Sequence, residues 1–565
     1  MRIAQHVKMT HGVRRGFHSA QISSILMLLA LVACSGPGNG PAGFVGAGDH
    51  KLAAPAEVGA CVTSTPPSGL YHVTVCLVSP SGGSTLKDNI TTKATVTVTG
   101  SAQAVQRVTF YLDGAYLLTD YQASYTFVLT TANWVDGNHK LAVNAVMRDG
   151  FVTQRASASV IFANGVTNVP ANPNHFQPTN GRDAASGSPF IVAAGGDGAS
   201  GQSTSDRVVD LLHTFNPNLF LYLGDVYERG TKEEFYNWYG VGSSSFSFLR
   251  SITDPTVGNH EYLTTGAAGY YDFWNNIPKY YSFNANGWHF ISLNSNTSYV
   301  PGAVGSAQYN WLQNDLAGLP SQTCTVVFYH HPLYNIGSEG NATGMTAIWQ
   351  LLAKYHVDIV LNGHDHDYQR WKPLDGNGAL NGNGITEFVA GGAGHGLQTS
   401  TRTDSRVAYS NDQNPTAFGL LLLQLNSRGA NYNYRNISGA VLDSGVIPCR
   451  PATLDSTPPT APGSFGATAP VSNRVQLTWT PSSDNVGVVG YKILRNGVIV
   501  ASIANWVDLA QLKYLDHAVV ASTTYKYSIY AYDLHGNHSA TVGPITVKTP
   551  TASLPDMADT YLAGN

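Results

Sequence analysis

The chain has few charged residues, few cysteines and no excess of positive charge. Lysine, arginine, aspartate and glutamate together make up 12% of its 565 residues, and the formal net charge is −4. Because there is no basic stripe interleaved with aromatic residues, a nucleic-acid partner is not expected. The apolar run ISSILMLLALVA near the N-terminus is too short for a comfortable membrane span. A polar but weakly charged surface of this kind suits an exported protein.

The first 33 residues have the pattern of a targeting segment rather than of a folded element. The tetrapeptide RRGF at 14–17 resembles a twin-arginine export signal. LVAC at 31–34 resembles a lipobox, in which Cys34 becomes the acylated first residue of a bacterial lipoprotein. The alternative is an ordinary secretory peptide whose cysteine and arginine pair arise by chance. We therefore expect a cell-surface lipoprotein, or else a periplasmic or secreted protein, with any membrane contact confined to a lipid anchor on Cys34.

Four cysteines remain if Cys34 is acylated: Cys61, Cys76, Cys324 and Cys449. An even number in an exported chain favours disulfides, and four cysteines allow three connectivities. Pairing Cys61 with Cys76 would close a short loop at the start of a domain. Pairing Cys324 with Cys449 would tie the start of a strand to the end of the central domain. These two bonds are our prediction among the three possibilities.

The length predicts three or four domains, because 565 residues exceed what one hydrophobic core supports. Regularly spaced alternating strands over 59–165 predict a β-sandwich, and its segments TFYLDGAYL and DGNHKLAVNAV resemble bacterial Ig-like domains. A second all-β unit over 464–549 resembles a fibronectin type III domain, in which Trp479 takes the inner-strand position and Tyr525 fits a tyrosine corner. Either unit could contact glycans or a cell surface, or could act as a spacer.

The central domain, 189–448, alternates strand-like runs with helical stretches such as 205–215 and 306–316. The remaining segments are rich in glycine, alanine, proline, serine or threonine, which favours connecting and trailing chain over packed structure. They are a flexible tether over 34–58, linkers over 166–188 and 449–463, and a loose tail over 550–565.

Five short polar motifs lie at or just after the ends of apolar runs in this central domain. In chain order they are GD at 196–197, GD at 224–225, GNHE at 258–261, VFYH at 327–330 and GHDH at 363–366. Apolar β-branched runs closed by glycine predict buried strands that end in tight turns. Because ligands collect beyond the carboxyl ends of strands in an open α/β sheet, we expect these side chains to converge. Carboxylates, an amide and imidazoles together are typical ligands of a pair of divalent or trivalent metal ions.

The order of these motifs resembles the calcineurin-like metallophosphoesterase superfamily, and most closely its purple acid phosphatase branch. That branch carries GDxG, GDxxY, GNH(D/E), VxxH and GHxH in the same order. The resemblance implies a central four-layer α/β/β/α sandwich flanked by two all-β sandwich domains. It also implies two ions of iron, zinc or manganese, held by Asp197, Asp225, Tyr227, Asn259, His330, His364 and His366. Asp225 would bridge the ions, His260 would assist the leaving group, and Glu261 would orient His260.

The chain departs from the purple acid phosphatase pattern in its first two motifs. Ala199 stands where the first motif usually has glycine, and Tyr227 comes one residue early in the second. In the enzymes of that branch this tyrosine binds the ferric ion. Here Tyr227 could still reach the metal, Glu228 could supply the oxygen instead, or a water could take the position.

Three further residues have two interpretations each. His331 follows His330 directly, so it should point away from the same ion and have a supporting or structural role. His395, in AGGAGHG, could line the pocket or bond to the backbone of its own loop. Arg370 could hold its loop in place or meet the substrate.

The function that this pattern predicts is an extracytoplasmic phosphoesterase with two metal ions, in which a metal-activated water attacks a phosphate monoester. A phosphodiesterase on the same site is one alternative, because the choice between the two substrates depends on loop shape. Another, from a different class, is a surface-binding protein that uses its β-domains and has an inactive central domain. The presence of His260 and of the expected metal positions favours the enzyme.

Overall fold

A computed structural model describes residues 60–101, 103–169, 171–186, 188–449, 455–505 and 512–551. The predicted signal peptide, the acylation site at Cys34 and the tether over 34–58 lie outside these residues, as does nearly all of the predicted tail over 550–565. No helix in these described ranges combines the length and the apolar character that crossing a membrane requires.

The first described region is a sandwich of two sheets. Its strands are β1 Cys61–Ser64, β2 Tyr71–Ser79, β3 Thr85–Leu86, β4 Asn89–Gly100, β5 Val105–Leu112, β6 Ala115–Asp120, β7 Thr126–Thr130, β8 Gly137–Met147 and β9 Ala156–Phe162, with a 3-10 turn at Thr131–Asn133. One sheet has the order β1-β2-β4-β7 and the other β3-β9-β8-β5-β6. Alternate residues of β2, Val73, Val75 and Leu77, are buried, so the period-two pattern turns one face of the strand into the core.

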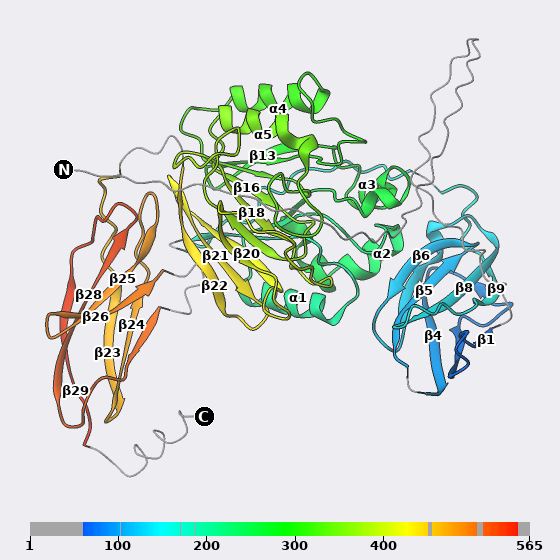
Figure 1. Ribbon diagram of the computed structural model, residues 1–565, viewed down its shortest axis with the longest axis horizontal. Helices are drawn as coiled ribbons and strands as arrows, with labels where there is room; N and C mark the ends of the chain where they lie inside the picture. Colours follow the sequence, from blue (N-terminus) through cyan, green and yellow to red (C-terminus); the bar gives the residue numbers. More distant parts are fainter. Residues whose placement is uncertain are drawn as a thin grey trace, which may run out of the picture. The chain divides into compact units, whose positions relative to one another are not determined.

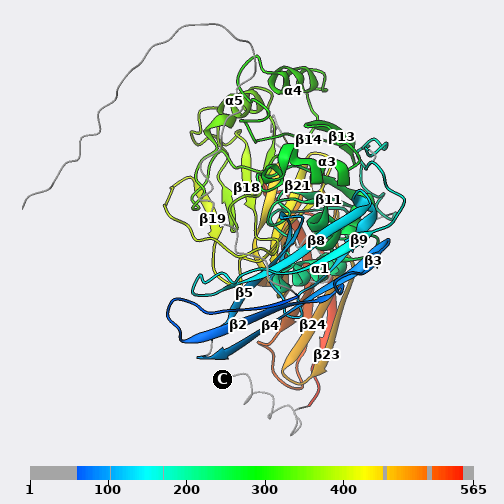
Figure 2. The same ribbon diagram turned by 90° about the vertical axis from the view of Figure 1, so that its right-hand side faces the viewer.

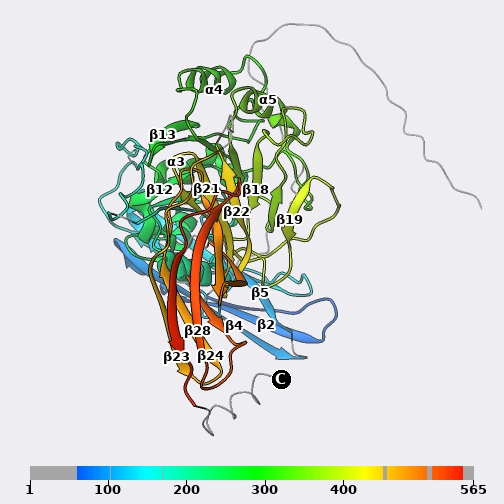
Figure 3. The ribbon, with the colours of Figure 1, turned by 90° about the vertical axis from the view of Figure 1, so that its left-hand side faces the viewer.

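The last described region is also a sandwich, of a three-stranded and a four-stranded sheet. Its strands are β23 Gly463–Val471, β24 Arg474–Thr480, β25 Val488–Arg495, β26 Val498–Ala504, β27 Lys513–Asp516, β28 Thr524–Asp533 and β29 Val542–Lys548. The sheets have the orders β23-β24-β27 and β26-β25-β28-β29, and Figure 3 shows β23, β24 and β28 of this region. Trp479 of β24 is buried in the core, and the backbone N–H of Val520 donates a 3.0 Å hydrogen bond to the Tyr525 hydroxyl oxygen, as a tyrosine corner requires.

The central domain contains two larger sheets. Its strands are β10 Phe190–Gly195, β11 Leu219–Tyr222, β12 Thr253–Pro255, β13 Tyr281–Ala285, β14 Trp288–Ser292, β15 Thr325–Phe328, β16 Ile359–Asn362, β17 Tyr368–Trp371, β18 Thr386–Ala390, β19 Val407–Asn411, β20 Gly419–Leu425, β21 Gly429–Asn436 and β22 Val441–Pro448. The six-stranded sheet has the order β12-β11-β10-β20-β21-β22, and the seven-stranded sheet β13-β14-β15-β16-β18-β17-β19.

Helices and helical turns connect the strands of these two sheets. They are α1 Ser203–Phe215, α2 Lys232–Glu234, α3 Ala268–Phe273, α4 Ala307–Ala317 and α5 Thr346–Lys354, together with a π-helical turn at Phe235–Tyr239 and 3-10 turns at Ser245–Ile252, Glu261–Leu263, Thr265–Ala267 and Thr343–Met345. Helix α1 lies against the six-stranded sheet, while α4 and α5 lie over the seven-stranded sheet (Figures 1 and 2). The Ser306 hydroxyl caps α4 by accepting the N–H of Tyr309 at 3.2 Å. The predicted four-layer α/β/β/α sandwich is confirmed.

Successive side chains of a central strand pack into different parts of the core, on opposite faces of the sheet. On β15, Val326 and Phe328 join the cluster that lies between the two sheets, whereas Val327 packs with Leu312 and Trp349 of the covering helices. Successive side chains of a strand point to opposite faces, so a continuous apolar run is what a strand covered on both sides requires.

Parallel pairing decides where the polar motifs lie. Strands β10, β11 and β12 are parallel neighbours in one sheet, and β14, β15, β16 and β18 are parallel neighbours in the other. Their carboxyl ends therefore share one edge of each sheet, and the loops with the five motifs leave from these ends.

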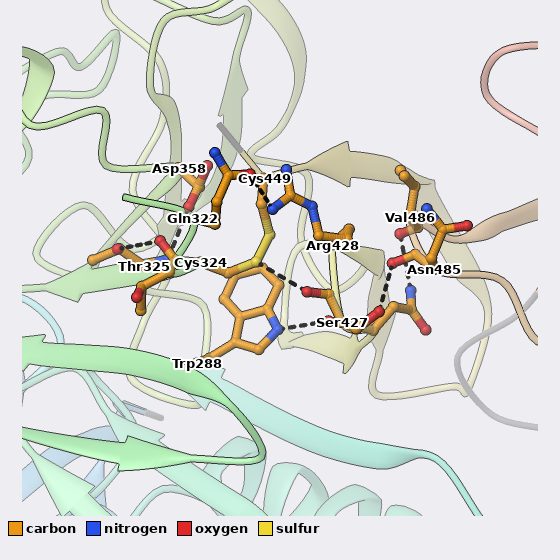
Figure 4. Close-up of a disulfide and its surroundings, with 12 residues drawn as sticks. Trp288, Gln322, Cys324, Thr325, Asp358, Ser427, Arg428, Cys449, Asn485 and Val486 are labelled. Carbon is orange, nitrogen blue, oxygen red and sulfur yellow. Dashed lines mark hydrogen bonds between the residues drawn. A yellow bond between two sulfur atoms is a disulfide. The ribbon is translucent and has the colours of Figure 1, made fainter. Parts of the chain in front are cut away.

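Both predicted disulfides are present, between Cys61 and Cys76 and between Cys324 and Cys449. The second joins the residue before β15 to the residue after β22, so it fastens one large sheet to the other (Figure 4). It lies at the amino end of β15, the end opposite the VFYH motif. Nearby, the Trp288 indole N–H donates a 2.8 Å hydrogen bond to the carbonyl oxygen of Asn426, which links the same two sheets.

Replacing Cys324 and Cys449 together by alanine should lower the free energy of unfolding of the central domain by about 2–5 kcal/mol, because the bond closes a separation of 125 residues. The matched control replaces Cys61 and Cys76, which are 15 residues apart. The loop-length dependence makes its expected loss smaller by about 2 kcal/mol. Denaturant titrations measure the free energy of unfolding of both variants, and equal decreases in the two would contradict the loop-closure argument.

Candidate metal centre

The structure brings the predicted metal ligands together at the carboxyl ends of the parallel strands. In the six-stranded sheet, Asp197 follows β10, Asp225 and Tyr227 follow β11, and Asn259 follows β12. In the seven-stranded sheet, His330 follows β15, and His364 and His366 follow β16. The site therefore lies where the loops of both sheets meet, and each sheet contributes a different kind of donor. Oxygen donors come from the first sheet and imidazole nitrogens from the second.

Three of these residues adopt a left-handed backbone conformation. Asp197, Asp225 and His364 have φ values of 62°, 65° and 75°. Such values are uncommon outside glycine and are found more often for aspartate, asparagine and histidine than for bulky residues. The sharp turn after each strand lets the side chain point back over the strand end, and strained backbone of this kind often accompanies function.

The carboxylates of Asp197 and Asp225 are the centre of the site. Both are almost completely buried, with 0% and 1% exposure, and their ligand atoms lie within 4.8 Å of each other and of a His330 nitrogen. The ion pairs of these two carboxylates within the described ranges are all with histidines, and lysine and arginine take no part in them. Two close buried carboxylates are costly unless cations neutralise them. Oxygen and imidazole donors around such a pair fit two metal ions of the hard-to-borderline class.

Tyr227 lies inside this cluster despite the shortened second motif. Its hydroxyl oxygen is 2.7 Å from Asp197 Oδ1, 3.2 Å from Asp225 Oδ2 and 2.8 Å from His366 Nε2. Burial, followed by the charges of Asp197 and Asp225, raises the pKa of the phenol well above its ordinary value. Glu228, the alternative oxygen donor, has its carboxylate beside Tyr121 and His395 instead.

Backbone carbonyl groups orient the imidazoles. His330 donates its Nδ1–H to the carbonyl oxygen of Leu223 at 2.8 Å, and His366 donates its Nδ1–H to that of Gly396 at 2.6 Å. A carbonyl oxygen can only accept, so in both rings Nε2 is left to face the carboxylates. Asn259 Oδ1 lies 2.9 Å from His330 Nε2, and so these two donors point at one place.

The carboxylates also set the protonation of the histidines. Burial alone would lower the pKa of His330, but Asp225 and Asp197 raise it to about 10. Burial and the neighbouring His330 lower the pKa of His364 to about 2 and that of His331 to about 3. A cation that binds here must displace the proton on His330, so its affinity should fall as the pH falls.

His260 lies at the open side of the cluster. Its backbone N–H donates to Asp225 Oδ1 at 2.9 Å, and its ring Nδ1–H donates to the carbonyl oxygen of Glu228 at 2.7 Å. The free Nε2 is 3.9 Å from Asp225 Oδ2, and 26% of the side chain is exposed. Burial would lower the pKa of His260, but the Asp225 carboxylate raises it above the ordinary value.

Glu261 has a role different from the one we predicted. Instead of bonding to the His260 ring, its carboxylate accepts the backbone N–H groups of Gly258 at 2.7 Å, Val226 at 2.7 Å and Asp225 at 3.3 Å. The side chain is 1% exposed. It therefore braces the loop that carries Asp225 against the loop that carries Asn259 and His260.

The three residues with open interpretations lie in different places. The ring of His331 is 4.3 Å from that of His364, and the ligand atoms of His330, His331 and His364 lie within 4.8 Å of one another, so His331 does not point away from the site as expected. His395 stacks on the Tyr227 ring at 3.9 Å and donates its backbone N–H to the Asp197 carbonyl oxygen.

Arg370 lies outside the cluster and joins two strands instead. Its guanidinium pairs with Asp443 through distances of 2.7 and 3.1 Å, which holds β17 to β22.

Sequence reasoning missed two residues near the site. Gln202 donates its side-chain N–H to His395 Nδ1 at 2.9 Å, and Tyr121, from the first sandwich, donates a hydrogen bond to the Glu228 carboxylate. Neither stands in a motif, and no local pattern marks them. Only the packing of separate segments brings them to the site.

Two segments of the chain match known families. Residues 199–368 match the family described as calcineurin-like phosphoesterase, and residues 74–143 match the bacterial Ig domain. Purple acid phosphatase 15 of Arabidopsis thaliana is 28% identical over 240 residues, covering 35% of this chain and 43% of the relative. A chitinase of Paenibacillus xylanexedens is 36% identical over 101 residues, covering 18% of each chain. The chain thus spans less than half the length of these relatives.

Among solved structures, a purple acid phosphatase from yellow lupin (Lupinus luteus) seeds aligns with a TM-score of 0.41 and 16% identity. The alignment covers 68% of this chain and 83% of that one.

Replacing Gly258 by alanine should weaken metal binding about 10–100-fold, the range typical for disturbed supports of metal ligands. An added Cβ would meet the Asp225 carboxylate and come within 2.8 Å of its backbone nitrogen, which would push this central side chain away. The matched control is Gly382→Ala, where the added atom meets nothing within 4 Å. Metal titration of both variants checks the prediction, and equal affinities would show that the close approach of Gly258 to Asp225 is not needed.

Proposed function

We propose that this chain, whose residues 199–368 are a calcineurin-like phosphoesterase domain, is a metal-dependent hydrolase that cleaves phosphate monoesters outside the cytoplasm. One observation carries the proposal. Two buried carboxylates, Asp197 and Asp225, are surrounded by a phenol, an amide and imidazoles, and their ion pairs in the described ranges involve only histidines. A structural role alone gives no reason to bury this charge at the edge of two sheets.

Asp225 is the residue that would connect two ions. Its Oδ2 is 3.2 Å from the Tyr227 hydroxyl oxygen on one side and 3.2 Å from His330 Nε2 on the other. The donors around one position would be Asp197, Tyr227 and His366, and those around the other Asn259, His330 and His364. Bound ions would supply positive charge for the phosphoryl oxygens and a water of lowered pKa.

The position of the phenol supports Tyr227, rather than Glu228, as the third donor of the first group. Its hydroxyl oxygen lies within 3.2 Å of Asp197, Asp225 and His366, whereas the Glu228 carboxylate accepts a hydrogen bond from Tyr121. The phenol lies in the cluster although Tyr227 comes one residue early in the second motif.

His260 would hold the proton that the leaving oxygen needs. The bond from its Nδ1–H to the Glu228 carbonyl oxygen fixes the ring, and Nε2 then faces the cluster beside Asp225. Protonation of an alkoxide as it departs is typically worth about 10²–10⁴-fold in rate. A cavity of about 340 Å³ is lined by His331, Ser295, Asn296 and Thr343 among others, and since the His331 ring lies 4.3 Å from that of His364, it would give room for the organic part of an ester.

Export of the protein has separate support. The two disulfides suit an oxidising compartment, and an Ig-like domain together with a chitinase among the relatives is consistent with a protein that acts outside the cell. We assign residues 464–549 to a fibronectin type III domain on the basis of the three- and four-stranded sheets and the Tyr525 corner. The leader and the acylated Cys34 belong to the same proposal.

The reaction can be tested with protein reconstituted separately with manganese, zinc or iron. We expect hydrolysis of an aryl phosphate monoester in preference to the matching diester. Asp225→Asn should lose metal and activity together, whereas His260→Gln should keep its metal and lose about 10²–10⁴-fold in kcat. Metal-loaded protein that cleaves neither ester would refute the enzyme assignment, and faster cleavage of the diester would refute the monoester assignment.

The visible spectrum tests the assignment of Tyr227. If Tyr227 binds iron as a phenolate, the iron-loaded protein should have a charge-transfer band that Tyr227→Phe lacks. Glu228→Gln should retain the band, because that carboxylate lies beside Tyr121. A band that persists in Tyr227→Phe but vanishes in Glu228→Gln would assign the oxygen donor to Glu228.

A further inference from the structure

The first sandwich contributes a side chain to the surroundings of the metal centre. Tyr121, directly after β6, donates a hydrogen bond to the Oε1 atom of Glu228. Glu228 is the residue after Tyr227, so this bond joins the Ig-like domain to the loop of the second motif. A hydrogen bond to a charged acceptor is among the stronger ones in proteins.

Glu228 in turn supports His260. Its carbonyl oxygen accepts the Nδ1–H of the His260 ring at 2.7 Å, the bond that leaves Nε2 facing the cluster. Its own backbone N–H donates to the Glu234 carboxylate. The main chain of residue 228 therefore orients His260, while Tyr121 holds its side chain.

Tyr121 also lies near the residue that stacks on Tyr227. Its ring centroid is 6.1 Å from that of His395, at an interplanar angle of 68°, and the Glu228 carboxylate lies 3.8 Å from His395 Nε2. His395 stacks on Tyr227 with ring centroids 3.9 Å apart. Tyr121 is thus connected to His260 through Glu228 and to Tyr227 through His395.

Other contacts hold the sandwich against the same part of the central domain. The Trp134 indole N–H donates to Glu233 at 3.2 Å, and the Val128 backbone exchanges hydrogen bonds of 2.9 and 3.1 Å with the Asn237 side chain. Trp238 packs against the sandwich core. Because these residues belong to α2 and the π-helical turn just after the second motif, the position of Tyr121 is set by an interface as well as by its own bond.

We propose that Tyr121 is a positioning residue for the leaving-group histidine, so that the Ig-like domain completes the active site of the phosphoesterase. This inference rests on the proposed function, in which His260 protonates the leaving oxygen. Without the Tyr121 hydroxyl, the Glu228 side chain loses the bond that ties it to the sandwich, so the loop whose carbonyl oxygen orients His260 is held less firmly. His260 then loses its fixed orientation, while every predicted metal ligand remains in place.

The test uses the full-length, metal-loaded protein and two monoesters, one with a nitrophenyl leaving group and one with an alkyl leaving group. Tyr121→Phe should lower kcat for the alkyl phosphate about tenfold, because an alkoxide departs only with a proton. The nitrophenyl ester should be affected much less, with KM and metal content unchanged for both. Trp134→Phe, which removes a different bond of the same interface, should match the wild type on both esters.

A second variant approaches the same link from the other domain. Glu228→Ala removes the acceptor and keeps the carbonyl group, so it should show the same selective loss on the alkyl ester. The double variant should be no worse than either single one, because all three remove one interaction. This arm also decides the question if Tyr121→Phe folds poorly.

Different outcomes would refute the positioning role of Tyr121 and the proposed phosphoesterase function. Wild-type protein that cleaves neither ester would refute the proposed function. Active wild type with Tyr121→Phe and Glu228→Ala unchanged, or slowed equally on both esters, would overturn the positioning role alone. Additive losses in the double variant would also overturn it, since Tyr121 would then act without Glu228.

Discussion

The free-energy cost of burying the two carboxylate charges of Asp197 and Asp225 is the main constraint on the structure of the central domain. Both are buried within reach of each other, and burial, with the charge of Asp225 adding to it, raises the pKa of Asp197. Backbone N–H groups offset part of this cost, from His364 to Asp197 at 2.8 Å and from His260 to Asp225 at 2.9 Å. The remainder requires positive charge, which a proton on His330 or a bound cation can supply.

A cluster of this kind is stable only if its loops cannot relax away from one another. Glu261 binds three backbone N–H groups from two of the loops, and Gly258 allows one loop to approach the Asp225 carboxylate more closely than any side chain would permit. At the opposite edge of the sheets, the disulfide from Cys324 to Cys449 limits how far one sheet can move from the other. The rigidity of the frame therefore holds the like charges together.

Much of this arrangement could be predicted from the sequence, because strand ends have a simple signature. Apolar runs, closed by glycine after β10, β11 and β16 and by histidine after β15, located these strands. The shared edge of parallel strands then brought Asp197, Asp225, His330 and His364 to one place.

What failed depended on loop conformation. The roles of Glu261 and His331 follow from backbone turns that residue type does not specify. For the same reason the sequence left open whether Tyr227, Glu228 or a water takes the oxygen position, although Tyr227 was among the predicted ligands and lies in the cluster. Tyr121 could not have been found, because no periodicity predicts which faces of two domains meet.

Protons and cations also compete for the same atom of this site. His330 Nε2 faces Asp225 and Asn259, so the proton that the carboxylates draw onto that ring, with a pKa of about 10, occupies the place that a metal ion would take. Two cases therefore offset the charge of these carboxylates, one with a proton on His330 and one with a bound cation in its place. In the first, His330 is an imidazolium paired with Asp225, and in the second it is a neutral ligand. The buried carboxylates that are costly without positive charge are thus the same groups that attract a cation to the site.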